Sequence, residues 1–132
     1  VSGGFDPVHV GHVRMIAAAA KLGDVIVIAN SDEWLVRKKG YMFMPYDERQ
    51  EILYNFKGVI DVVEASDDDG SVCKTLERIK PDIFANGGDR KNDNVPEVAL
   101  CNELGIELVW NIGGDKIQSS SELVANSRNK GD

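Results

Sequence analysis

Two histidines stand at a spacing that suits chemistry on a phosphate group. His9 and His12 lie three residues apart at the expected start of a helix over Gly11–Leu22, so both imidazoles face the same side. The N–H groups of the first helical turn, at Gly11 and His12, would add an anion site at the positive end of the helix dipole. Imidazole and amide donors together suit a phosphoryl centre whose charge rises in the transition state. The pattern therefore predicts a site for phosphate transfer or phosphate binding.

Two histidines at this spacing could also bind a metal ion. A metal site needs further ligands at matching spacing, and no third histidine, cysteine or carboxylate stands there. The two cysteines, Cys73 and Cys101, fall in stretches that look helical and lack partners at metal-ligand spacing. We therefore expect no metal held by the protein alone, and we expect both thiols to be reduced rather than joined in a disulfide.

The elements that must position the histidines alternate between short apolar strands and helices. Expected strands are the end of one at Val1–Gly4, then Asp24–Asn30, Gly58–Glu64, Asp82–Ala85 and Ile106–Trp110. Expected helices are Gly11–Leu22, a short one from Ser31 or Asp32 to Lys39, Asp47–Phe56, Val72–Ile79, Pro96–Leu104 and a last one introduced by Ser119–Ser121. This alternation predicts an α/β fold: one domain over residues 1–132, with a single Rossmann-like, doubly wound parallel sheet and helices on both faces.

Glycine pairs follow three of the expected strands. They are Gly3-Gly4, Gly87-Gly88 and Gly113-Gly114. In an open parallel sheet the ligand lies beyond the carboxyl ends of the strands, and glycine lets the backbone approach it closely. Three pairs on one edge predict a ligand that lies against main chain.

Charge and hydropathy exclude several classes of protein. The net charge is −7, and because residues 1–57 carry equal numbers of acidic and basic side chains, the whole excess lies in residues 58–132. There is no extended basic stripe, so nucleic acid is not an expected partner. No apolar run approaches the roughly 20 residues of a membrane span, and no segment reads as a secretory signal. We expect a cytoplasmic protein that does not bind membranes.

With these residues placed, the sequence resembles the nucleotidyltransferase superfamily that carries the HxGH signature. GGFDPVHVGH contains the signature, and Lys38-Lys39-Gly40 is followed by the helix YDERQEIL, as in cytidylyltransferases. PDIFANGGDR is similar to the nucleotide-binding turn of bacterial heptose-phosphate adenylyltransferases, and IQSSSEL is similar to the ISSTxI segment of these families. The resemblance runs in the right order over nearly the whole chain.

By position, this resemblance implies a role for each site residue. It places His9 and His12 at the α-phosphate and the departing pyrophosphate, Lys39 (with Lys38 as second choice) on a mobile loop at the reacting phosphates, and Arg49 at the acceptor phosphate or triphosphate. It places Gly4, Phe5, Asp6 and Gly11 around the nucleotide, Gly87, Gly88 and Asp89 at base and ribose, and Ser119 and Ser120 at the β- and γ-phosphates.

The resemblance implies in-line transfer of a nucleotidyl group from a nucleoside triphosphate to a phosphorylated small molecule. Mg²⁺ would accompany the triphosphate and keep most of its waters. The GGD turn leans towards ATP and a sugar phosphate, while CTP with glycerol 3-phosphate is nearly as consistent. Homodimers are common in the superfamily, so a homodimer is a further prediction.

Departures from the family patterns concern the nucleotide side of the site. Before the serine run, Lys116 stands where some cytidylyltransferases have an arginine, and within Ser119–Ser121 a serine replaces the usual threonine. Arg90 follows the GGD turn, where heptose enzymes commonly have an aromatic residue. These changes weaken any transfer of base or acceptor preference.

Two other readings compete with this one. HVGH also resembles the HIGH signature of aminoacyl-tRNA synthetases, but those enzymes need tRNA-recognising domains for which 132 residues leave no room. A non-catalytic nucleotide sensor of the same fold is the second alternative. Such a module could lose the catalytic pair, whereas His9, His12 and both lysines are present here.

Overall fold

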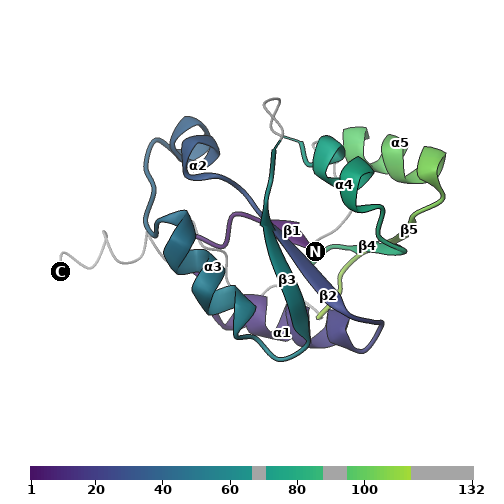
Figure 1. The fold of residues 1–132 in the computed structure, drawn as a ribbon, viewed down its shortest axis with the longest axis horizontal. Coiled ribbons are helices and arrows are strands. Elements are labelled where there is room, and N and C mark those ends of the chain that lie inside the picture. Colours follow the sequence, from purple (N-terminus) through teal and green to yellow (C-terminus); the bar gives the residue numbers. More distant parts are fainter. Residues whose placement is uncertain (67–70, 88–94, 114–132) are drawn as a thin grey trace.

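The computed structural model describes residues 1–66, 71–87 and 95–113, and in this part of the chain strands alternate with helices (Figure 1). In chain order the elements are β1 (Ser2–Gly3), α1 (Val10–Ala20), β2 (Val25–Ala29), α2 (Asp32–Lys39), α3 (Tyr46–Tyr54), β3 (Val59–Glu64), α4 (Cys73–Ile79), β4 (Ile83–Ala85), α5 (Val95–Leu104) and β5 (Glu107–Val109). Every strand pair among these elements is parallel, which confirms the α/β fold class.

The strands form two hydrogen-bonded groups where one continuous sheet was expected. β2 lies between β1 and β3, and β4 pairs with β5. The physical reason is the shortness of β1, whose two residues pair only with β2, at Ile28 and Ala29. A pocket of about 370 Å³ lies between the two groups and is lined by the starts of β2 and β4, at the end of the strands away from the histidines.

Side chains alternate across β2 and build a core on each of its faces. Val25, Val27 and Ala29 pack in one cluster with residues of α1 and α3, while Ile28 packs in a second cluster with residues of α4, α5 and β4. A strand buried on both faces is typical of a parallel sheet covered by helices on each side. The helices accordingly lie on both faces, as predicted, with α1 and α3 on one side and α4 and α5 on the other (Figure 1).

Local chemistry explains where the site-bearing helices begin and end. The hydroxyl of Ser31 accepts a hydrogen bond from the Trp34 amide at 3.1 Å and caps α2. Gly40 ends that helix in the left-handed conformation, with φ of 83°. The observed bounds lie within two residues of those expected, and the last helix, introduced by Ser119–Ser121, lies outside the described residues.

Among the described residues, no helix combines the length and the apolar character needed to cross a membrane.

Candidate active site

His9 and His12 lie against each other at the start of α1. Their rings stack with centroids 3.9 Å apart and an interplanar angle of 25°. His9 is the N-cap residue: its Nδ1 accepts a hydrogen bond from the Gly11 amide at 3.0 Å, while His12 Nδ1 accepts one from the His9 amide at 3.1 Å. This reciprocal pair is a capping box in which both capping side chains are imidazoles.

The capping bonds fix the tautomer of both histidines. A backbone amide can only donate, so each Nδ1 must be an unprotonated acceptor, and in the neutral ring the proton then sits on Nε2. Each imidazole can therefore act as a hydrogen-bond donor through Nε2, the atom directed away from the capping bond. Two such donors held side by side suit two oxygens of one phosphate or of neighbouring phosphates.

Two residues predicted to contact the nucleotide also support the histidine pair. The Gly11 amide, expected to face an anion, donates to His9, and the His12 amide donates to the His9 carbonyl at 2.9 Å. Phe5 is only 2% exposed and packs its ring against the edge of His12, with centroids 4.8 Å apart. These groups therefore hold the histidines in place, and their contact with a nucleotide stays a prediction.

Asp6 and Lys39 form a buried ion pair beside the turn that leads into α1. The Asp6 carboxylate is fully buried, and Oδ2 lies 3.4 Å from Lys39 Nζ, which also donates to the Asp6 carbonyl at 2.9 Å. Lys39 comes from the last turn of α2, and its ammonium lies 5.1 Å from the centre of the Tyr41 ring. The structure thus places Lys39 at the site, whereas Lys38 is exposed on α2.

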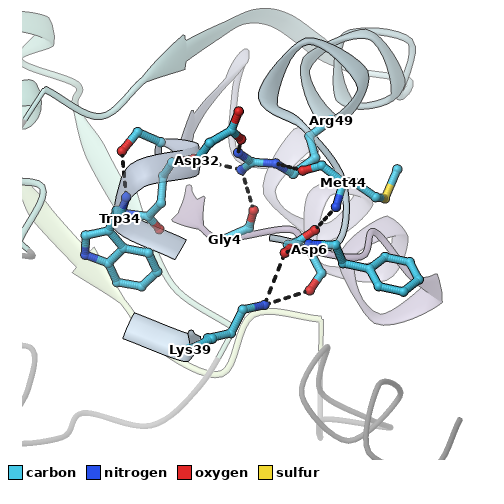
Figure 2. A network of polar contacts seen from close by, with 10 residues as sticks. Gly4, Asp6, Asp32, Trp34, Lys39, Met44 and Arg49 are labelled. Carbon is cyan, nitrogen blue, oxygen red and sulfur yellow. Dashed lines mark hydrogen bonds and ion pairs between the residues drawn. The ribbon is translucent and has the colours of Figure 1, made fainter. Parts of the chain in front are cut away.

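Arg49 is fully buried and is hydrogen-bonded to several groups of the chain itself. Its Nη1 donates to the carbonyls of Gly4 and Asn30 at 2.8 and 2.7 Å, and its Nη2 pairs with Asp32 at 2.7 Å. Its Nε donates to the Met44 carbonyl at 3.0 Å (Figure 2). Because these donors are directed at protein acceptors, Arg49 joins the ends of β1 and β2 to the loop before α3, and its predicted contact with a substrate phosphate stays a prediction.

The residues that follow β4 and β5 lie close to Met15 of α1. A Cβ added at Gly87 would lie 2.9 Å from Met15 Sδ, and one added at Gly113 would lie 2.9 Å from Met15 Cα. Gly113 also has φ of 87°, which favours glycine. Both glycines therefore permit the close approach of these strand ends to α1, within a turn of His12.

Four predicted nucleotide contacts lie outside the described residues. These are Gly88, Asp89, Ser119 and Ser120. Of the glycine turn after β4, the structure describes Gly87 and its neighbour Asn86, whose buried Nδ2 has no hydrogen-bond partner.

The sequence reasoning missed the acceptors and donors that complete the network around Asp6 and Arg49. Asp32, expected only as a possible first residue of a short helix, is the carboxylate partner of Arg49. The amides of Phe43 and Met44 both donate to Asp6. The sequence does not show where a backbone amide points, so the bonds from Phe43 and Met44 could not be predicted. Asp32 and Arg49 carry opposite charges near the starts of successive helices, and this was a signal that could have predicted their ion pair.

No metal-binding cluster is formed by the part of the chain that the structure describes: no group of three or more histidine, cysteine or acidic side chains there could hold a metal ion. Cys73 and Cys101, both in the described part of the chain, are not joined in a disulfide.

These features define an α/β protein with paired imidazole donors and a lysine gathered at the carboxyl ends of parallel strands. A family model described as cytidylyltransferase-like matches residues 1–128, and the chain belongs to this family of nucleotidyltransferase-like enzymes.

Known proteins similar to the chain agree with this assignment. FAD synthase of Ferroglobus placidus is 36% identical over 92 residues, covering 70% of this chain and 59% of that protein. The bifunctional protein HldE of Streptomyces coelicolor is 34% identical over 110 residues, covering 81% of this chain and 23% of that protein. The crystal structure of a lipopolysaccharide core biosynthesis protein from Thermoplasma volcanium superposes with a TM-score of 0.69 at 28% identity, covering 89% of this chain and 94% of that one.

The chain thus spans about three fifths of the FAD synthase and under a quarter of this HldE protein. The likeness to HldE concerns one segment of a longer polypeptide.

Proposed function

We propose that the chain transfers a nucleoside monophosphate from ATP or CTP to the phosphate of a small molecule and releases pyrophosphate. The observation that carries this proposal is the histidine capping box, which holds two stacked imidazoles with Nε2 as the donor atom of each. Family membership supports the reaction class, and the position of Lys39 adds a cation next to the same turn.

The reaction needs positioning and charge stabilisation, and no covalent enzyme intermediate. An oxygen of the acceptor phosphate attacks the α-phosphorus in line, the new P–O bond forms, and the bond to the pyrophosphate oxygen breaks. The acceptor is already an anion, so no strong base is required. His9 and His12 would donate from Nε2 to oxygens of the α-phosphate and of the leaving pyrophosphate, where charge increases. Lys39 would hold the incoming and α-phosphates together.

Magnesium fits this scheme as a partner of the triphosphate. When bound, Mg²⁺ would neutralise charge on the phosphate oxygens and keep most of its waters. Asp6 is not a ligand for it in this structure, because its carboxylate already accepts bonds from Lys39 and from two backbone amides. Ser119 and Ser120 remain the predicted contacts of the β- and γ-phosphates.

Adenylyl transfer to a phosphorylated acceptor is the version we favour. FAD is AMP joined through a pyrophosphate bond to a phosphorylated compound, so the name of the FAD synthase describes a product of this type. The likeness to HldE and to a lipopolysaccharide core biosynthesis protein supports a sugar phosphate as acceptor. A base or ribose lying against Gly87 would also offer an acceptor to the unpaired Nδ2 of Asn86.

We also propose a cytoplasmic location, because Cys73 and Cys101 are not joined in a disulfide and cysteines stay reduced in that compartment. A homodimer stays a prediction, for which sedimentation of the purified chain is the direct measurement.

A matrix of pyrophosphate-release assays tests the proposed function. ATP and CTP are each combined with sugar, glycerol, choline, ethanolamine and flavin phosphates, in the presence of Mg²⁺. We expect release with one pair well above the rate without acceptor. Nucleotide binding without release in any pair would favour the sensor alternative, and release stimulated by amino acids would favour the synthetase-like alternative.

A further inference from the structure

One buried carboxylate accepts from three donors, one in the last turn of α2 and two in the segment between α2 and α3. Asp6 is 0% exposed. Its Oδ2 accepts from the Phe43 amide at 2.8 Å, its Oδ1 accepts from the Met44 amide, and Lys39 Nζ lies 3.4 Å from Oδ2 (Figure 2). A buried charge is stable only when it is paired and hydrogen-bonded, and all the donors that satisfy Asp6 here come from residues 39–44.

The segment that Asp6 holds begins at Gly40, the residue that caps the end of α2. Gly40 has φ of 83°, and a side chain added there would meet no atom within 4 Å, so packing does not fix the chain at this point. Phe43 is 59% exposed, which leaves its side chain without a core contact to fix it. The bonds to Asp6, together with the bond from Arg49 Nε to the Met44 carbonyl, therefore restrain this segment between the last turn of α2 and the start of α3.

The same carboxylate restrains the ammonium of Lys39. A lysine side chain has four rotatable carbon–carbon bonds and loses rotamer entropy when it is ordered. Here Nζ is held by the Asp6 carbonyl at 2.9 Å and by the carboxylate, and the side chain is 16% exposed. Part of the ordering of Lys39 is thus completed before any substrate arrives.

We propose that Asp6 is a positioning residue that acts through Lys39 and the 39–44 segment and does not contact the nucleotide itself. The sequence had indicated a place for Asp6 around the nucleotide. This inference rests on the proposed function, because it assigns Lys39 to the reacting phosphates. Its physical basis is that a misplacement of about 1 Å in a positioning group can cost on the order of 10² in rate.

The first test is a double-mutant cycle on turnover. Asp6→Asn keeps the size of the side chain but removes the charge and one of the two acceptor oxygens. Asp6→Asn and Lys39→Gln should each lower kcat by about 10- to 100-fold while the KM for the triphosphate changes less than about threefold. If Asp6 acts through Lys39, the double variant should be no slower than the slower single variant. Fully additive losses would overturn the proposal.

The second test measures the position of Lys39 without any turnover. Brief acetylation with an amine-reactive ester, read by mass spectrometry, compares Lys39 with its exposed neighbour Lys38. In the native wild type we expect Lys39 to react at least about fivefold more slowly, and we expect Asp6→Asn to remove most of that difference. The matched control is Asp24→Asn, an exposed aspartate in the turn before β2, which should leave the ratio unchanged.

The two tests separate the possible failures. If the wild type releases no pyrophosphate in any pair, the proposed function fails, while the acetylation ratio still tests whether Asp6 holds Lys39. If Asp6→Asn does not fold, the wild-type ratio decides: equal rates at Lys38 and Lys39 in the native protein would overturn the proposal, and protection of Lys39 that is lost in urea would support it.

Discussion

Replacing Arg49 by methionine should lower the stability of the fold, because Arg49 bonds to several segments around the candidate site. Arg49 is 0% exposed, and it supplies the donors for the carbonyls of Gly4, Asn30 and Met44 as well as the partner of Asp32. Methionine keeps an unbranched apolar stem, is shorter than arginine and donates no hydrogen bond. The substitution therefore leaves three carbonyls and one carboxylate without their donors.

The size of the loss follows from these contacts. A buried carbonyl left without a donor costs about 1–3 kcal/mol, and removing one partner of a buried ion pair costs about 3–5 kcal/mol. The Asp32 side chain is 41% exposed, so water can solvate it when Arg49 is gone. We expect Arg49→Met to lower the free energy of unfolding by about 3–5 kcal/mol, a large part of the roughly 5–15 kcal/mol of a typical domain.

Urea unfolding followed by circular dichroism measures this loss, with Arg78→Met in α4 as the control. Arg78 is exposed, and its replacement should change the unfolding free energy by about 0.5 kcal/mol or less. If Arg49→Met cost less than about 1 kcal/mol but abolished pyrophosphate release, Arg49 would be acting on the substrate, as the family resemblance implied. The structural role described above would then be wrong.

Two further substitutions or modifications follow from single contacts. Gly58→Ala places a Cβ 2.6 Å from Ala20 Cβ at a residue with φ of 94°, so we expect the free energy of unfolding in urea to fall by about 1–3 kcal/mol. The control is Gly23→Ala, where an added Cβ meets nothing within 4 Å and the change should be near zero. Equal effects of the two substitutions would contradict the packing seen at Gly58. Burial raises the pKa of the Cys101 thiol, so at pH 8 a smaller fraction of it is thiolate than at its ordinary pKa. Iodoacetamide should therefore modify the half-buried Cys73 before the buried Cys101 in the native protein. Modification of both cysteines at the same rate would refute this.

Hydrophobic periodicity was enough to predict most of the fold. The run from Asp24 to Asn30 is short, β-branched and apolar on both faces, and it became the central strand β2. Ser31 and Gly40 gave the limits of α2 because capping depends on local residues. Periodicity could not predict that the strands form two hydrogen-bonded groups, because this depends on how many residues of β1 pair with each neighbouring strand.

The sequence was enough to predict the histidine pair of the candidate site, but not the partners of its charged side chains. The spacing of His9 and His12 put both on one side of the start of α1, and the structure stacks them there. The sequence could not tell that Lys39 is held by Asp6 or that Arg49 points inward, because a cation in a helix looks the same whether its partners are carbonyls or a phosphate. Buried charges are found through their partners, and these carbonyl and amide partners belong to the backbone.

The account depends most directly on the imidazole donors, and one measurement tests them: the kcat of pyrophosphate release for His12→Ala with the best triphosphate and acceptor pair. Loss of one well-placed donor to a transition state costs on the order of 10²–10³ in rate, so we expect a kcat at least about 10²-fold below that of the wild type in a protein with native circular dichroism. A correctly folded His12→Ala protein with normal kcat would contradict the central claim.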